Sequence, residues 1–340
     1  MVDSVTIGDA TLFCGDAADV LSTLPEQSVQ CVVTSPPYWG LRDYGVEGQI
    51  GLEPDLVAYG KALERVFAQV RRILRQDGTL WLNMGDAYTS GGRESYDTTS
   101  SNKSNSAVCG MERRIGGKPK DLIGLPWQVA FMLQATGWYL RSDIIWHKPN
   151  PMPESVKDRP TRAHEYIFLL TKSQYYFYDA EAIREPGAWS GKAPAGWDTG
   201  SGSHGTTHRT GREKRKHPVP RGSAQPHSGF NGKWDHMTTQ EQRTMGRNKR
   251  SVWTVATRPF PEAHFATFPE KLIEPCILAG SRAGDVVMDP FMGSGTTGVV
   301  CAKHGRRFVG VELNEEYLAM AGRRIDAAQR QGRLPLEEVS

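Results

Sequence analysis

Residues 285–312 read D-V-V-M-D-P-F-M-G-S-G-T-T-G-V-V-C-A-K-H-G-R-R-F-V-G-V-E. The apolar run that ends at Asp289 predicts a strand, the glycines open a helix, and the run that ends at Glu312 predicts a second strand. Because two strands joined by a crossover helix lie parallel in one sheet, this stretch predicts an α/β fold.

The loop of this unit has the G-x-G-x-x-G pattern, formed by Gly293, Gly295 and Gly298, with Glu312 about twenty residues further on. Glycines let the backbone approach a ligand, and a carboxylate at a strand end can accept hydrogen bonds from two ribose hydroxyls. A nicotinamide-dependent dehydrogenase is one interpretation of this pattern. Asp289, directly before the loop, instead favours a ligand with an ammonium group, because a pyrophosphate would be repelled by it.

A second stretch, residues 32–40, reads V-V-T-S-P-P-Y-W-G. Prolines cannot donate ladder hydrogen bonds, so the strand must end at Thr34 or Ser35. Ligands of an open α/β sheet bind beyond the carboxyl ends of its strands, where the Ser35 hydroxyl, the Pro36 carbonyl and the Tyr38 ring would lie. Two acceptors beside a flat ring suit an amino group on an aromatic ring. A proline-rich turn with a packed aromatic is the alternative.

The other segments continue the alternation of strands and helices. Asp16 follows a short apolar strand and precedes a helical pattern, so it fits either a helix N-cap or a ligand contact. We expect strands at 11–14, 79–84, 139–150 and 163–173, and helices at 17–24, 56–74, 126–136 and 268–280.

The charge is unevenly distributed along the 340 residues, a length that allows one large domain or two ordinary ones. Between Arg184 and Arg258, 14 Lys and Arg face five Asp and Glu, a net charge of +9 in a chain of net charge +3, so the remainder is −6. Aromatics, among them Trp234 and Trp253, are interspersed with the basic residues. This segment is typical of a DNA-contacting region, and a solvated basic loop is the alternative.

The five cysteines are scattered without a C-x-x-C pair, which favours neither a disulfide framework nor a zinc site. No export signal or apolar run of 18 residues is present. We therefore expect a cytoplasmic protein without a membrane span.

The stretches T-S-P-P-Y-W-G and D-P-F-M-G-S-G-T-T together resemble the two main motifs of the amino-group DNA methyltransferases. Their order along the chain is similar to the permuted β group of that family. The resemblance implies a mostly parallel, seven-stranded Rossmann-like sheet with helices on both faces and a basic, loop-rich target-recognition region. It implies a catalytic half at 1–183, target recognition at 184–258 and a cofactor-binding half at 259–340.

The resemblance also implies S-adenosylmethionine as the methyl donor and no metal. It assigns Ser35, Pro36, Pro37 and Tyr38 to catalysis, and it places His147, Lys148 and Asn150 at the rim of the base pocket. The basic segment would contact DNA through Arg212, Lys214, Arg215 and Lys216. The expected cofactor-binding residues are Asp16, Thr267, Phe268, Asp289, Phe291, Gly293, Ser294, Gly295, Thr296, Thr297 and Glu312.

The target implied by a Ser in the first motif position is the 4-amino group of cytosine in duplex DNA, with the 6-amino group of adenine as the alternative. A neutral hydroxyl can accept from an amine and donate onward, whereas a carboxylate only accepts. Methylation at ring position five would need a cysteine nucleophile, and it is disfavoured beside the Ser-Pro-Pro-Tyr motif. The resemblance allows a homodimer and a cognate restriction endonuclease as partners.

Overall fold

A computed structural model describes residues 3–41, 43–89, 118, 120–186, 246–257 and 268–333. The chain divides into two units, Met1–Ala182 with Arg250–Ser340, and Ile183–Lys249. In the smaller unit, the described residues include an antiparallel bridge between Glu185 and Arg247. The predicted DNA contacts Arg212, Lys214, Arg215 and Lys216 lie outside the described residues, as does Thr267.

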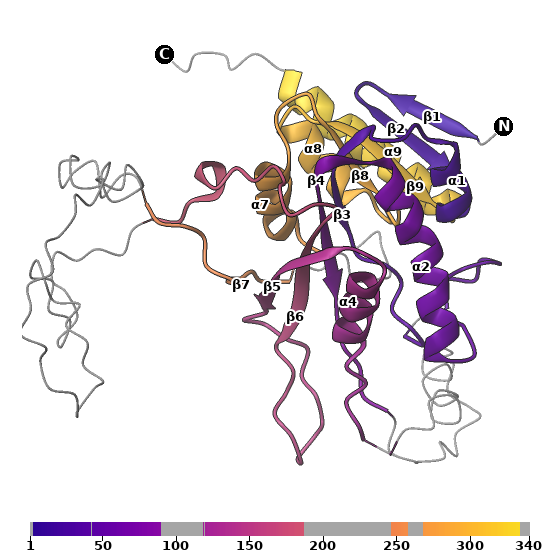
Figure 1. Cartoon of the computed structure of the whole chain (residues 1–340), viewed down its shortest axis with the longest axis vertical. Helices are drawn as coiled ribbons and strands as arrows, with labels where there is room; N and C mark the ends of the chain where they lie inside the picture. Colours follow the sequence, from indigo (N-terminus) through magenta and orange to yellow (C-terminus); the bar gives the residue numbers. More distant parts are fainter. Residues whose placement is uncertain are drawn as a thin grey trace, which may run out of the picture. The chain divides into compact units, whose positions relative to one another are not determined.

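The described part of the larger unit contains one nine-stranded sheet in the order β1-β2-β9-β8-β3-β4-β6-β5-β7 (Figure 1). All strands except β1 and β6 run in the same direction. The strands are β1 (Ser4–Ile7), β2 (Ala10–Cys14), β3 (Val29–Thr34), β4 (Leu74–Met84), β5 (Tyr139–His147), β6 (His164–Thr171), β7 (Val252–Thr254), β8 (Val286–Asp289) and β9 (Arg307–Glu312).

The predicted mostly parallel α/β sheet is confirmed. In the order of the sheet, the seven strands that run from β2 across to β5 form its main part. Two short edge strands, β1 and β7, are added to the expected seven. β7 lies inside the segment that the sequence assigned to DNA contact. Trp253 of β7 is only 5% exposed, and its ring centroid lies 6.5 Å from that of Trp81. Trp253 is therefore a core residue and has no free face on which a base could stack.

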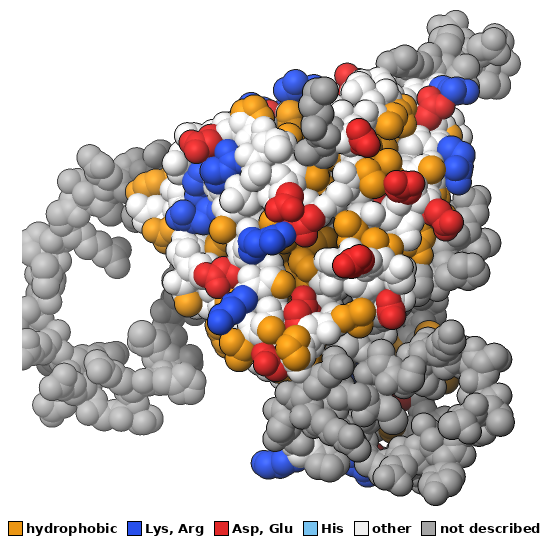
Figure 2. Space-filling model, turned by 90° about the vertical axis from the view of Figure 1, so that its right-hand side faces the viewer, with side chains coloured by type: hydrophobic (Ala, Val, Ile, Leu, Met, Phe, Trp, Pro, Cys, Tyr) orange, Lys and Arg blue, Asp and Glu red, His pale blue; other side chains and the backbone are white. Residues whose placement is uncertain are grey.

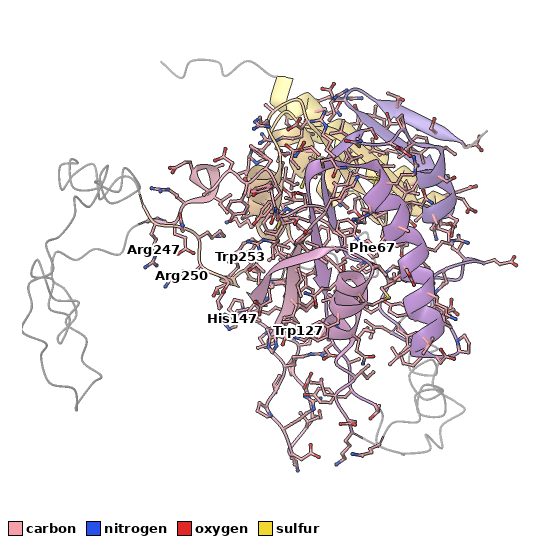
Figure 3. All side chains as sticks on the ribbon, in the orientation of Figure 1. Phe67, Trp127, His147, Arg247, Arg250 and Trp253 are labelled. Carbon is pink, nitrogen blue, oxygen red and sulfur yellow. The ribbon has the colours of Figure 1, made fainter. Side chains whose placement is uncertain are left out.

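Helices cover both faces of the sheet, as expected (Figure 1). On one face, Phe67 of α2 lies in a single apolar core with Leu80 and Leu82 of β4. The half-buried Trp127 of α4 packs against this core (Figure 3). On the other face, Gly280 of α7 approaches β4 so closely that a Cβ would lie 2.5 Å from Thr79 Oγ1. The helices are α1 (Ala17–Thr23), α2 (Leu56–Ile73), α4 (Leu125–Ala135), α7 (Glu270–Gly280), α8 (Thr296–Lys303) and α9 (Glu315–Arg333), with a 3-10 turn η2 (Glu181–Ile183).

The junction between α2 and β4 differs from the expected one. The sequence predicts that Asp77-Gly78 separates the helix from a strand that starts at Thr79, but β4 begins at Leu74, directly after α2. Gly78 lies within the strand, and a Cβ there would come within 2.9 Å of the Gln30 carbonyl oxygen. The glycine therefore allows close strand packing and does not form a turn.

Surface charges of both signs are mixed on the face shown in Figure 2. Within the described residues, no helix is both long enough and apolar enough to cross a membrane.

Candidate active site

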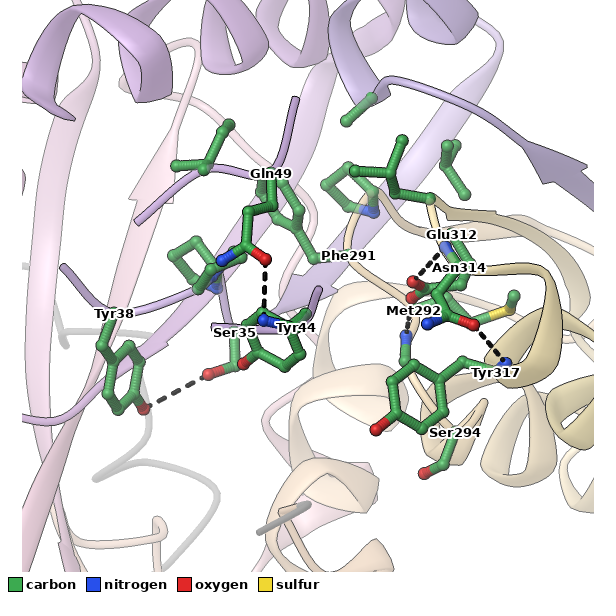
Figure 4. Close-up of a pocket in the computed structure, with 18 of the residues that line it drawn as sticks. Ser35, Tyr38, Tyr44, Gln49, Phe291, Met292, Ser294, Glu312, Asn314 and Tyr317 are labelled. Atoms are coloured by element: carbon green, nitrogen blue, oxygen red, sulfur yellow. Dashed lines mark hydrogen bonds between the residues drawn. The ribbon is translucent and has the colours of Figure 1, made fainter. Parts of the chain in front are cut away.

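A cavity of about 320 Å³ lies at the carboxyl ends of the central strands. Its volume is in the range of small-molecule sites, and its position is the one expected for an open α/β sheet. Both predicted motifs contribute to it: Ser35 to Tyr38 line one end, and Gly293, Ser294 and Glu312 line the other (Figure 4). We call these the base end and the donor end.

At the base end, β3 stops at Thr34 and the Ser-Pro-Pro-Tyr motif follows directly, as the prolines predict. The Ser35 hydroxyl donates to Tyr38 Oη at 3.2 Å. The Tyr59 hydroxyl of α2 donates to the Pro37 carbonyl at 2.9 Å. The buried Trp39 indole donates to the Glu53 carbonyl at 3.0 Å. The motif is therefore held by side chains of its own half of the chain.

Tyr38 also contacts two residues that the sequence did not indicate. Its hydroxyl donates to Glu165 Oε2 of β6 at 3.1 Å and accepts from Asn83 Nδ2 of β4 at 3.1 Å. Burial raises the pKa of the Tyr38 phenol well above 10, and the Glu165 charge adds to this shift. The phenol is therefore a permanent hydrogen-bond donor at neutral pH.

Lys148 and His147 are both predicted at the rim of the base pocket, but only Lys148 lies in the cavity wall. Lys148 lines the cavity, forms an ion pair with Glu165, and places its ammonium 4.3 Å from the Trp146 ring centroid. His147 is not part of the cavity wall, and its Nδ1 lies 3.1 Å from Thr254 Oγ1 of β7. The Asn150 side chain accepts from Thr257 N at 3.0 Å and donates to the Thr257 carbonyl at 3.1 Å. DNA contact by these residues stays a prediction.

At the donor end, Glu312 is held by the backbone of its own motif. Its Oε2 accepts from Gly293 N at 2.8 Å and its Oε1 accepts from Asn314 N at 2.9 Å. Burial raises the pKa of this carboxyl above its ordinary value, although the amide donors oppose the shift. Gly293 and Gly295 adopt φ of 53° and 79°, in the left-handed region that favours glycine.

Two predicted cofactor residues, Asp289 and Thr297, lie behind the cavity wall. Asp289 is 1% exposed and accepts from Thr34 Oγ1 at 2.7 Å, Thr297 Oγ1 at 2.8 Å and Phe291 N at 3.1 Å. Burial raises its pKa to about 6. This carboxyl joins the end of β3 to the start of α8, and its predicted contact with an ammonium group stays a prediction.

Most of the other predicted cofactor residues lie in the cavity wall, and their contact with a cofactor stays a prediction. Phe268, Phe291, Ser294 and Thr296 line the cavity. Gly295 is outside the wall, where a Cβ would lie 2.7 Å from that of Ala321 in α9.

Asp16 is the N-cap that one of its two interpretations predicts, and its predicted cofactor contact stays a prediction. Its Oδ1 caps α1 by accepting from Asp19 N at 3.0 Å and pairs with Arg65 at 2.5 Å, while the residue lines the cavity.

Several residues in the cavity wall or bonded to it were missed. Arg324 of α9 donates to Ser294 Oγ at 2.9 Å and to Thr296 Oγ1 at 3.3 Å, which fixes two hydroxyls of the loop. Tyr44 N donates to Gln49 Oε1 at 2.7 Å in the segment after the motif, and both residues line the cavity. Asn83 and Glu165 also line the cavity and were missed. The signals that could have indicated them are a polar residue at the end of one apolar strand and an acid at the start of another, 164–171. Among the described residues, no group of three or more His, Cys, Asp or Glu could hold a metal ion.

Comparison with known proteins gives a consistent match. A family model of the N6 and N4 type, described as DNA methylase, matches residues 29–323. The chain is 47% identical over 95% of its length to the Type II methyltransferase M.Cfr9I of Citrobacter freundii, of which it covers 90%. It is 46% identical over 92% of its length to M.SmaI of Serratia marcescens, again covering 90%.

Two solved structures are similar over most of the chain. One, from Thermus thermophilus, is designated a putative DNA modification methylase and was crystallised with S-adenosyl-L-methionine; it has a TM-score of 0.55, 25% identity and 93% coverage of each chain. The cytosine-N4-specific PvuII DNA methyltransferase has a TM-score of 0.57 and 17% identity, covering 96% of this chain and 93% of its own, a likeness of fold alone. The matched range 29–323 contains both ends of the cavity, from Ser35 to Glu312.

Proposed function

The chain belongs to the family of DNA methylases of the N6 and N4 type, and we propose that it methylates the 4-amino group of cytosine in duplex DNA, with S-adenosylmethionine as donor. The observation that supports this most is that one cavity is lined at one end by Ser35-Pro-Pro-Tyr38 and at the other by the glycine loop with Glu312. A base and a donor bound at these ends would meet inside the cavity.

The donor end fits S-adenosylmethionine by its donor and acceptor groups. The Glu312 oxygens accept from the backbone amides of Gly293 and Asn314, and an ionised carboxylate can also accept from ribose hydroxyls. Phe268 and Phe291 give apolar surface for an adenine ring, and Ser294 and Thr296 give hydroxyls near the helix start. When bound, the donor supplies a methyl group activated by a sulfonium.

At the base end, the residues of this chain would orient the amine. The target nucleotide has to leave the duplex, because its amine is not accessible in the stack. The Tyr38 ring gives a stacking surface, and the Ser35 hydroxyl and Pro36 carbonyl give two acceptors. Conjugation flattens the amine, so acceptors aimed at its two hydrogens favour the pyramidal geometry of attack, an effect realised mainly in the transition state.

Cytosine is favoured over adenine by the hydroxyl in the first motif position. In the structure this hydroxyl donates onward to Tyr38 and accepts from Asn83 Nδ2 at 3.5 Å, which leaves one lone pair for an amine. A carboxylate in the same position could only accept.

We also propose that residues 184–258 recognise the DNA sequence, as their excess of basic residues suggests. The Type II designation of the relatives suggests a restriction-modification setting with a cognate endonuclease, and a homodimer is part of the same proposal.

One experiment decides the target atom. Duplex DNA is methylated with labelled S-adenosylmethionine, digested to nucleosides, and the product is identified by mass. We expect 4-methylcytosine. A product of 6-methyladenine would keep the enzyme class and overturn the target, whereas binding of a nicotinamide cofactor without methyl transfer would contradict the proposal as a whole.

A further inference from the structure

Glu165, at the start of β6, connects the motif at the base end to a charge outside it. Its Oε2 accepts from Tyr38 Oη and from Asn83 Nδ2, both at 3.1 Å. Its Oε1 contacts the Lys148 ammonium, and only 16% of the Glu165 side chain is exposed. A carboxylate is thus held at the end of a hydrogen-bonded row that starts at Ser35.

The direction of the hydrogen bonds in this row follows from the chemistry of its last member. A carboxylate can only accept, so the Tyr38 hydroxyl must donate to Glu165. The Tyr38 oxygen then has lone pairs to accept the proton of Ser35, whose Oγ lies 3.2 Å away. Both hydroxyl protons therefore point from the motif toward Glu165, and a lone pair of Ser35 Oγ is left for the target amine.

We propose that Ser35, Tyr38 and Glu165 form a proton relay that removes the proton released from the target amine, with Glu165 as the terminal acceptor. The inference rests on the proposed function, since it needs an amine substrate at the base end. As the nitrogen–carbon bond forms and the sulfur–carbon bond of the donor breaks, the positive charge passes to the amine nitrogen, which must then lose one proton.

Three transfers along existing hydrogen bonds balance this step. The amine proton moves to Ser35 Oγ, the Ser35 proton moves to Tyr38 Oη, and the Tyr38 proton moves to Glu165 Oε2. The products are a neutral methylamino base, a neutral thioether and a protonated Glu165, which returns its proton to solvent between turnovers. Ser35 and Tyr38 end the step with the same number of protons as they had at its start.

The surroundings suit these roles. Tyr38 cannot itself be the final base, because burial raises the pKa of its phenol well above 10. Among the described residues, the ionisable groups that contact the Glu165 carboxylate are Lys148 from the end of β5 and Tyr38 from the loop after β3, while Asn83 of β4 is neutral. The Lys148 ammonium balances the negative charge in a site where neither side chain is more than 19% exposed.

The test uses substitutions that keep shape and remove proton transfer. Glu165→Gln retains the length of the side chain and an oxygen that accepts from Tyr38, but it cannot take up the proton. Tyr38→Phe retains the stacking ring and interrupts the row. We expect each change to lower the single-turnover rate about 10²-fold, since a positioned general base contributes about 10² to 10⁴. The double variant should be no slower than either single variant, because both act on one path.

Three further measurements separate a relay from a merely structural role. Binding of S-adenosylmethionine by calorimetry and extrusion of a 2-aminopurine target by fluorescence should match the wild type. The pH dependence of the single-turnover rate should differ between the wild type and Glu165→Gln, because the variant cannot take up the proton. As a matched control, Glu274→Gln removes a carboxylate that lies 2.8 Å from His304 and outside the cavity, and should have the wild-type rate.

Two results would overturn the relay while leaving the proposed function intact. One is a wild-type rate for Glu165→Gln. The other is recovery of the rate in Lys148→Met/Glu165→Gln, which would mean that Glu165 only balances the lysine charge. A wild-type protein that methylates neither cytosine nor adenine would instead contradict the proposed function itself.

Discussion

The two ends of the cavity are built in different ways. At the donor end, Glu312 is held by backbone amides of Gly293 and Asn314, residues no more than nineteen positions away in sequence. At the base end, Tyr38 and Glu165 meet from 127 positions apart through side chains alone. A motif fixed by its own backbone can be recognised in a sequence, whereas a network of side chains exists only once the sheet has formed.

The largest expected effect concerns the base end. Ser35→Ala removes the hydroxyl that orients the amine, and we expect the single-turnover rate to fall roughly 10²-fold or more, as for loss of other orienting groups. Affinity for S-adenosylmethionine, measured by calorimetry, should change little, because Ser35 lies at the other end. A matching loss of donor affinity would show that the two ends are not independent.

The next effect concerns Asp289, which joins the two ends. Its folded-state pKa of about 6 lies above the ordinary value of 3.8, so the folded protein binds the proton more tightly than the unfolded chain. Its contribution to stability is therefore greatest at low pH and is lost as pH rises through about 6, by about 3 kcal/mol in total. Asp289→Asn has no such proton, so the difference in unfolding free energy between the two proteins should change between about pH 4 and pH 7. A constant difference across that range would refute the inferred shift.

The smallest effect concerns the donor end. Glu312→Ala should weaken S-adenosylmethionine binding by roughly 1 to 3 kcal/mol, as expected when a charged hydrogen-bonding partner is lost. Binding of duplex DNA should be unchanged when measured without the donor. If DNA binding falls by the same amount, Glu312 supports the whole cavity and the distinction between the ends has to be abandoned.

The same contrast explains what could be predicted. The strand that ends at Glu312, the glycine loop and the strand that stops before Pro36 follow from local patterns, and all were found as expected. The closeness of Asn83 and Glu165 to the motif depends on strand order, because β4 lies between β3 and the antiparallel β6. Periodicity predicts that a strand exists and does not predict its neighbour.

Side-chain direction was the other quantity that the sequence could not supply. Asp289 and Thr297 lie next to cavity residues in sequence but turn into the core, where they bond each other. Similarly, Trp253 has a basic, loop-like sequence context, yet the tertiary structure buries it in an edge strand. In each case long-range packing, and not local composition, decided the outcome.

The strand order also affects how the protein is made. β2 and β3 are synthesised early but are not neighbours, because β9 and β8, at residues 286–312, fill the gap between them. At about 5 to 20 residues per second, a ribosome needs on the order of tens of seconds to go from β3 to β9. During that time two apolar strands have unpaired inner edges, which other chains can bind. A chain that stops before Val286 keeps both edges open, so it is expected to aggregate and not to persist as a smaller folded protein.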